Sequence, residues 1–230
     1  MTVSSRRAIV HSFADLVGRP FGGGVNALCW PRTLEGDFAE VARLLAPPEG
    51  LVVVRASTLR ALSLSVAGRA AADAMMEDLR RLDELGYDPV LNCITSYPRD
   101  ERGLPMTTDV MSFHADRSPI EVDTWLCTYH GKSSEGLDNG DARRLIDSPE
   151  IRAALLKEYA SEDDDGFAEF IREGSFDLHF GAGDNAQPFS FGVGNLWRIA
   201  VEWPGCPVPP CIHRAPQTVA GDEPRLLLIC

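Results

Sequence analysis

The chain has 230 residues, of which 44% are hydrophobic and 24% are charged, the composition of a soluble globular protein that can bury a core. Its formal net charge of −12 argues against a general binder of nucleic acid or of an anionic membrane surface, because like charges repel. No apolar run reaches membrane-spanning length. A small-molecule substrate is therefore favoured, and no nucleic-acid or membrane partner is expected.

The first third of the chain predicts mainly helices. Residues 1–24 end in three consecutive glycines and predict a loose lead-in. Short buried strands are predicted at 24–30 and 51–54. Helices are predicted at 34–45 and 57–85, where apolar residues recur at helical spacing.

From residue 89 onward the pattern changes to short β-branched and aromatic runs between Pro, Gly and Asp. These runs predict strands at 89–95, 109–114, 122–130, 188–192, 195–203, 210–213 and 225–229. An amphipathic helix is predicted at about 148–173, and the acidic run 162–166 is expected to break it in two. Helices followed by many short strands indicate an α+β protein whose core is a double-stranded β-helix, a cupin-like jelly roll, with helices packed on it.

We expect one domain over residues 1–230, because no repeat or low-complexity linker interrupts the chain. Its parts are a mainly helical segment, 1–88, and a jelly-roll segment, 89–230, that carries the helical insertion. Arg6 and Arg7 resemble a twin-arginine export signal, but the residues that follow are too polar for one. The prediction is a cytoplasmic protein.

Six cysteines are scattered along the chain, and most lie in apolar runs typical of buried, reduced thiols. Cys206 and Cys211 differ, because four residues separate them and three of those four are prolines. The pair could form a disulfide or bind a metal, but no second pair of matching spacing follows. A rigid proline-rich turn is the favoured interpretation.

Three residues predict a metal site. His114 and Asp116 form an H-x-D pair, and His213 lies in a late predicted strand. On an extended strand residues two apart point to the same face, so the pair can reach one ion. With His213 they would complete the two-His, one-carboxylate triad of non-haem Fe(II) sites, which leaves other coordination positions open.

An arginine twelve residues after His213 extends this pattern. Arg225 could bind the far carboxylate of a 2-oxo acid through two parallel hydrogen bonds. Arg214, adjacent to His213, and Arg198, in an aromatic strand, are the alternatives for that role. The cofactors predicted are Fe(II) and 2-oxoglutarate.

Candidate substrate-binding residues lie in or after strands expected near the metal. They are Glu135, Asn139, Trp197, Arg198 and His130. His130 could instead lie behind the ligands or be a third imidazole of an all-histidine site. His179, at the edge of a predicted loop, is interpreted as structural.

Several short stretches together resemble an uncharacterised bacterial family of cupin-like proteins, domain of unknown function eighteen twenty-six. The matching pieces, in chain order, are 24–32, 113–116, 126–131, 134–137, 194–197, 202–205, 212–216 and 225–228. The resemblance implies a cupin fold and metal ligation by His114, Asp116 and His213. Two departures concern the substrate: Thr124 stands where the family has an arginine, and the segment 147–187 is longer than usual.

The leading hypothesis is an Fe(II)- and 2-oxoglutarate-dependent dioxygenase that hydroxylates or desaturates a small polar metabolite, such as an amino acid, with molecular oxygen. A second is a cupin-type dioxygenase or isomerase that binds its substrate directly on the metal. A zinc hydrolase would use the same ligands but lacks an obvious general base. A non-enzymatic metal- or ligand-binding cupin would hold metal without turnover.

Overall fold

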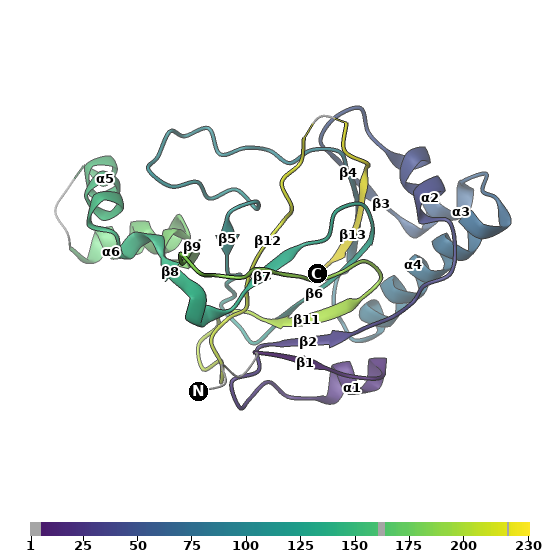
Figure 1. The fold of residues 1–230 in the computed structure, drawn as a ribbon, viewed down its shortest axis with the longest axis horizontal. Helices are drawn as coiled ribbons and strands as arrows, with labels where there is room; N and C mark the ends of the chain where they lie inside the picture. The colour runs from purple at the N-terminus through teal and green to yellow at the C-terminus, as the bar shows by residue number, and fades with distance from the viewer. Residues whose placement is uncertain (1–5, 161–163, 220) are drawn as a thin grey trace.

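The computed structural model describes residues 6–160, 164–219 and 221–230. The described chain forms two curled, mainly antiparallel β-sheets and six α-helices, so the expected α+β class is confirmed (Figure 1). One sheet has seven strands in the order β1-β2-β11-β6-β13-β4-β3, and the other has six in the order β10-β7-β12-β5-β9-β8. None of the described helices combines the length and apolarity needed to cross a membrane.

The elements have the following bounds. The helices are α1 (Phe13–Gly18), α2 (Phe38–Leu45), α3 (Ala56–Ala61), α4 (Val66–Glu84), α5 (Pro149–Tyr159) and α6 (Asp165–Glu173). The strands of the seven-stranded sheet are β1 (Arg7–Ile9), β2 (Ala27–Trp30), β3 (Leu51–Val54), β4 (Val90–Ile94), β6 (Asp123–His130), β11 (Leu196–Ala200) and β13 (Arg225–Ile229). Those of the six-stranded sheet are β5 (Phe113–His114), β7 (Glu135–Leu137), β8 (Ala142–Arg144), β9 (His179–Ala182), β10 (Phe189–Ser190) and β12 (Ile212–Arg214).

The seven-stranded sheet buries both faces, and alternation along its strands separates two cores. On β6, Trp125 and Tyr129 join the core shared with the helices, whereas Leu126 joins a second core. On β13, Leu228 belongs to the first core and Leu227 to the second. Successive side chains of a strand point to opposite faces, so Leu126 and Leu227 mark the face that meets the six-stranded sheet.

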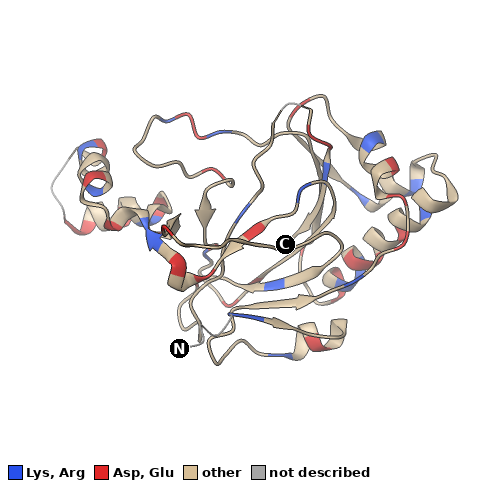
Figure 2. Cartoon of the chain, viewed as in Figure 1, with Lys and Arg blue, Asp and Glu red and all other residues tan. Residues whose placement is uncertain are grey.

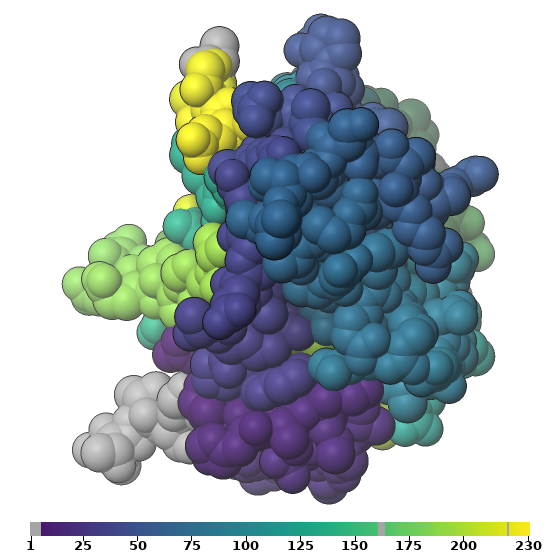
Figure 3. Space-filling model, turned by 90° about the vertical axis from the view of Figure 1, so that its right-hand side faces the viewer, coloured from purple at the N-terminus to yellow at the C-terminus, as the bar shows by residue number. Residues whose placement is uncertain are grey.

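The outer face of the large sheet is covered by helices. Val41 of α2 and Met75 of α4 are fully buried against Leu91 and Leu228 of the sheet. Figure 3 shows this helical layer in blue above the purple N-terminal segment. At the opposite end of the molecule, α5 and α6 form a separate small core around Phe167 (Figure 1).

A buried polar cluster ties the helices to the sheet. The guanidinium of Arg32 donates to Oδ1 of Asp78 at 2.7 Å, and the hydroxyl of Tyr129 donates to Oδ2 of Asp78 at 2.7 Å. Arg32 also donates to the carbonyl oxygen of Gly194 at 2.9 Å. Asp78 lies on α4 and Tyr129 on β6, so this polar cluster spans the helix–sheet interface.

Two predictions about the N-terminal third are wrong. Residues 1–24 are not a loose lead-in throughout, because the described part contains β1, which pairs with β2, and α1, which Ser12 caps. The helix predicted over 57–85 is two helices, α3 and α4, separated after Leu62. There Ser65 caps α4 through the N–H of Gly68, and the guanidinium of Arg69 binds the carbonyls that end α3.

The insertion is broken in two as expected, since α5 ends at Tyr159 and α6 begins at Asp165; residues 162 and 163 of the acidic run lie outside the described residues. The short strands β7, β8 and β9 were not predicted, because three- and four-residue strands carry too little alternation to detect. All six cysteines are free thiols, Cys206 and Cys211 included.

Candidate metal centre

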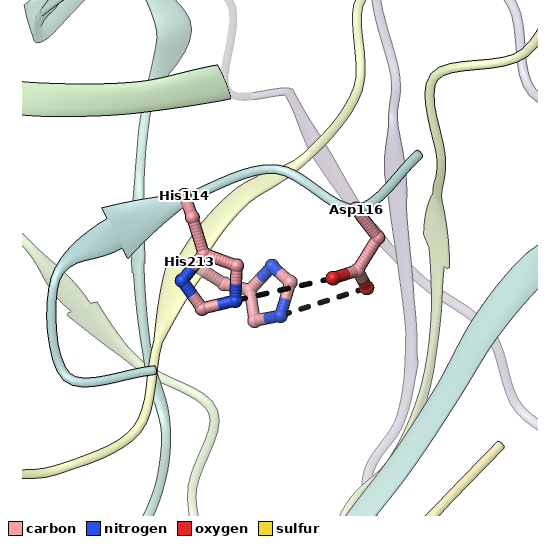
Figure 4. Close-up of side chains that lie close together, drawn as sticks. All are labelled: His114, Asp116 and His213. Atoms are coloured by element: carbon pink, nitrogen blue, oxygen red, sulfur yellow. Dashed lines mark ion pairs between the residues drawn. The ribbon is translucent and has the colours of Figure 1, made fainter. Parts of the chain in front are cut away.

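The three predicted metal ligands lie together between the two sheets (Figure 4). His114 ends β5 and His213 is its direct partner on β12, with ring centroids 4.6 Å apart. Asp116 follows β5 by two residues and faces both rings. Its Oδ1 lies 3.9 Å from Nε2 of His114 and its Oδ2 lies 3.8 Å from Nε2 of His213. One ligand atom from each residue lies within 4.8 Å of the others, so the three could hold a metal ion.

Backbone and hydroxyl groups fix the orientation of each ligand. Nδ1 of His114 lies 2.8 Å from the carbonyl oxygen of Ser112, and Nδ1 of His213 lies 3.3 Å from that of Cys211. Each ring therefore turns Nε2 toward the shared space. The hydroxyl of Thr124 donates to Oδ2 of Asp116 at 2.6 Å. Such outer hydrogen bonds hold metal ligands in place and tune them.

Burial favours the protonation states that a metal needs. Burial, together with the neighbouring His213, lowers the pKa of His114 from 6.5 to about 4. Burial alone would raise the pKa of Asp116, but His213 and the Thr124 hydroxyl outweigh it, so that pKa is lowered. A neutral His114 and an ionised Asp116 are the forms that coordinate a cation.

The shifted pKa of His114 predicts a pH-dependent stability of the metal-free protein. Between pH 6.5 and about 4 the unfolded chain binds more protons at this residue than the folded chain does. The free energy of unfolding therefore falls as pH falls through that window, by at most about 3 kcal/mol from this group. Urea unfolding at pH 7 and near pH 4.5 should show a smaller fall for His114→Gln than for the unsubstituted chain. An identical fall in both would contradict this assignment.

A cavity of about 240 Å³ opens beside the three ligands. Its polar lining consists of the three ligands, Asn92, Tyr97, Ser134 and Arg225. The rest of the wall is apolar: Leu51, Ile94, Val110, Leu126, Ala215, Leu227 and Ile229. The two sheets therefore enclose a small pocket that has the metal ligands on one wall and an arginine on another.

Arg225 is a buried cation that has no carboxylate partner among the described residues. It lies on β13 and is only 3% exposed. Most other charged residues lie on helices and loops (Figure 2). Its guanidinium donates to the hydroxyls of Tyr97, Thr128 and Ser134, the last two at 2.9 and 2.6 Å, while its Nε has no acceptor. Burial lowers the pKa of Arg225. Because an unpaired buried charge is costly, this arrangement suits an anionic ligand.

One strand positions both ends of this site. Thr124, Leu126 and Thr128 alternate along β6 on its inner face. Thr124 holds Asp116, Leu126 lines the pocket and Thr128 holds Arg225. The strand thus fixes the metal end and the arginine end of the pocket relative to each other.

These two threonines give a matched pair of substitutions. Thr124→Val removes the hydrogen bond to Asp116 and is expected to lower the affinity for a divalent metal by about ten- to a hundredfold. Thr128→Val makes the same change of shape on the same strand face and should leave metal affinity almost unchanged. Equilibrium dialysis with Mn(II) measures both, and equal losses in the two variants would contradict the role given to Thr124.

The structure does not bring Arg214 and Glu135 into this pocket. Because His213 faces the pocket, the next residue on β12 faces the other way. Arg214 donates to Oε2 of Glu135 from two nitrogens, at 2.8 and 2.5 Å, and its guanidinium lies 4.1 Å from the ring centroid of Phe113. Glu135 and Arg214 therefore satisfy each other.

Asn139 and Trp197 also have internal partners. Asn139 accepts a hydrogen bond from the side chain of Asn26 at 2.8 Å and donates to the carbonyl oxygen of Pro210 at 3.0 Å. Trp197 donates from Nε1 to the carbonyl oxygen of Phe191 at 2.7 Å and packs in the core between the sheets. Neither lines the pocket.

Arg198 and His130 also have partners within the chain and do not line the pocket. Arg198 pairs with Asp123 at 2.6 Å and donates to carbonyl oxygens that end α1. His130 lies 3.3 Å from a carboxylate oxygen of Glu223, beside a separate surface hollow that Lys132 also lines. It is not part of the three-residue ligand group.

Sequence reasoning missed several residues of the site. Tyr97, Thr128 and Ser134 bind Arg225, and Thr124 binds Asp116. Alternation along β6 could have placed the two threonines on the face of Leu126, but nothing in the sequence marks Tyr97. His179, interpreted as structural, lies opposite His114 on β9, with ring centroids 5.9 Å apart.

Comparisons with known proteins add no assignment. No protein-family model, no curated protein and no solved structure matches this chain. The resemblance to the cupin-like family therefore stays a prediction, and the chemistry has to be inferred from the site itself.

Proposed function

We propose that this chain is a non-haem Fe(II)- and 2-oxoglutarate-dependent oxygenase built on a jelly-roll core. The observation that carries the proposal is the buried Arg225, which has no carboxylate partner among the described residues and opens onto the same pocket as the His114, Asp116 and His213 group. A metal ion and a cation on two walls of one small cavity suit a short dicarboxylate.

The residues have distinct roles in this proposal. His114, Asp116 and His213 would hold Fe(II) and leave positions for the 2-oxo acid and oxygen. Arg225, held by the hydroxyls of Tyr97, Thr128 and Ser134, would bind the far carboxylate. When bound, the iron would supply the oxidative decarboxylation of 2-oxoglutarate to succinate and carbon dioxide by molecular oxygen, coupled to oxidation of the substrate. Because Asp116 would occupy the coordination position that a halide ion needs, hydroxylation or desaturation is favoured over halogenation.

The pocket limits where a substrate could bind. At about 240 Å³ it is smaller than the roughly 300–1,000 Å³ typical of ligand cavities, so the co-substrate would occupy much of it. Leu51 and Val110 line the pocket and are 48% and 43% exposed. They mark its rim, where we place the substrate. A small metabolite whose aliphatic part contacts this apolar rim fits the proposal.

The same residues disfavour a zinc hydrolase. Apart from the three ligands, no carboxylate or imidazole lines the pocket in the described part of the chain. A metal-activated water would therefore lack a general base.

Turnover tests the oxygenase proposal. Protein loaded with Fe(II) without oxygen and then exposed to air should consume oxygen and form succinate only when 2-oxoglutarate is present, slowly without substrate and faster with it. His213→Ala should abolish both signals. Iron-dependent oxygen uptake that does not need 2-oxoglutarate would instead support direct binding of substrate to the metal. Bound metal with no reaction toward any 2-oxo acid or substrate would support a non-enzymatic cupin.

A further inference from the structure

One polar side chain of the pocket has no role in the site described above. Among the lining residues, Tyr97 and Ser134 are bonded to Arg225, and three others are the candidate metal ligands. Asn92 is the polar residue of this lining that remains. It is partly buried, and its carboxamide has no hydrogen-bond partner among the described residues.

Asn92 lies at the centre of β4, on the face of the large sheet that meets the six-stranded sheet. Its direct neighbours across the ladder are apolar, Leu227 on β13 and Val53 on β3. Val90 and Ile94, two residues away on the same strand, share its face and are also apolar. Asparagine is depleted in strands, and an amide among apolar side chains gains nothing from their packing. A residue that breaks the local rules of its strand in this way is expected at a ligand-binding position.

The charges of the pocket disfavour an ionised substrate group beside Asn92. Asp116 is the one carboxylate in the described lining, and in the proposed function it binds the metal. A substrate ammonium would therefore have no anionic partner and would share the pocket with Arg225. A substrate carboxylate would compete with 2-oxoglutarate for that arginine. The carboxamide of Asn92 has an acceptor oxygen and two donor hydrogens, so it suits an uncharged group that both donates and accepts.

We propose that Asn92 is the substrate-specificity residue of this pocket and that it binds a primary carboxamide carried on an aliphatic chain. Two carboxamides can form a pair of hydrogen bonds in which each N–H donates to the carbonyl oxygen of the other. Apolar surroundings strengthen such bonds. Leu51, diagonal to Asn92 across β3 and β4, continues the apolar wall to the rim, where the aliphatic chain would lie. This inference rests on the proposed function for the reaction, but amide binding can be measured without turnover.

Nuclear magnetic resonance titration of the isotope-labelled, Zn(II)-loaded chain with excess 2-oxoglutarate tests the assignment, because zinc supports no oxidation. Pentanamide, added up to about 50 mM, should shift the side-chain amide signal of Asn92, which Asn92→Leu identifies by its loss. Backbone signals of β4 follow binding in the variants. Asn92→Leu should weaken pentanamide binding by about tenfold without lowering stability toward urea, because leucine fits the apolar surroundings.

Asn92→Asp tests specificity, because it keeps the shape of the side chain and adds an anion. It should reverse the preference of the pocket from pentanamide to pentylammonium. Asn185→Asp, the same change at an exposed asparagine outside the pocket, should leave the preference for pentanamide as it is in the unsubstituted chain.

The proposal is overturned if pentanamide does not bind, if it binds equally well to Asn92→Leu, or if Asn92→Asp keeps the original preference. A loss of stability in Asn92→Leu would also overturn it and make the amide structural. So would a loss of 2-oxoglutarate affinity in Asn92→Leu as large as that in Arg225→Met, because Asn92 would then bind the co-substrate. A chain that binds pentanamide through Asn92 but binds no 2-oxoglutarate would contradict the proposed function and support the amide site.

Discussion

Arg225→Met is expected to lower the affinity for 2-oxoglutarate by about a hundredfold or more, since a charged hydrogen-bonded partner is worth roughly 2–5 kcal/mol when buried. The same substitution should change the free energy of unfolding by only about 1 kcal/mol, because it removes a buried cation that has no carboxylate partner among the described residues. Calorimetric titration of the metal-loaded protein and urea unfolding of the metal-free protein measure the two effects.

Arg225→Lys is the matched control for charge. It keeps the cation but loses the planar fork that binds a carboxylate through two hydrogen bonds, so affinity should lie between those of Arg225→Met and the unsubstituted chain. A large loss of stability in Arg225→Met with unchanged 2-oxoglutarate binding would contradict the role given to this residue and make it structural.

Arg32→Met is expected to have the opposite profile and to lower the free energy of unfolding by about 3–5 kcal/mol. Arg32 pairs with Asp78, and both side chains are almost fully buried, at 8% and 2% exposure. Removing the guanidinium leaves a buried carboxylate whose remaining partners among the described residues are the Tyr129 hydroxyl and a more distant Arg81, 3.9 Å away. Urea or thermal unfolding measures the change.

The double variant Arg32→Met with Asp78→Leu distinguishes two effects on stability: the loss of the ion pair, and the burial of one charge without a partner. It should recover much of the lost stability, because replacing both ions by apolar groups removes the buried charge. No recovery would show that the packing of Arg32 against Trp30, 4.9 Å from its guanidinium carbon to the ring centroid, matters more than its charge.

The two arginines distinguish a structural cation from a ligand-binding one. Both are buried, but Arg32 is paired with the carboxylate of Asp78, whereas the partners of the Arg225 guanidinium among the described residues are hydroxyls. A protein that buries an uncompensated charge gives up stability, and such sites are often functional. The contrast between the two substitutions therefore tests the proposed site independently of turnover.

The sequence was most informative where chemistry and spacing coincide. His114, Asp116 and His213 were predicted as one group and lie as one group. The prediction placed His114 and Asp116 on one strand. In the structure β5 ends at His114, and Asp116 reaches the site from the segment that follows the strand. Thr124, across on β6, holds Asp116 in place of the strand backbone.

Where the prediction needed the orientation of a side chain in the fold, the sequence was less informative. Arg214 and Arg225 were both candidates for carboxylate binding. Alternation on β12 could have placed Arg214 opposite to its neighbour His213, but Arg225 reaches the pocket from the other sheet, which only the tertiary arrangement reveals. Tyr97 lies in a segment without periodicity. The break between α3 and α4 depends on Arg69 and Ser65, which are ordinary helix-surface residues in sequence.

Anaerobic titration of the Fe(II)-loaded protein with 2-oxoglutarate tests the central claim most directly. A 2-oxo acid chelated to iron gives a weak visible charge-transfer band. We predict such a band in the unsubstituted chain, its absence in His114→Ala and a much weaker band in Arg225→Met at the same concentration of 2-oxoglutarate. Iron binding without a band would contradict the use of 2-oxoglutarate as co-substrate. A chain that binds no iron would contradict the proposal that His114, Asp116 and His213 form an iron site.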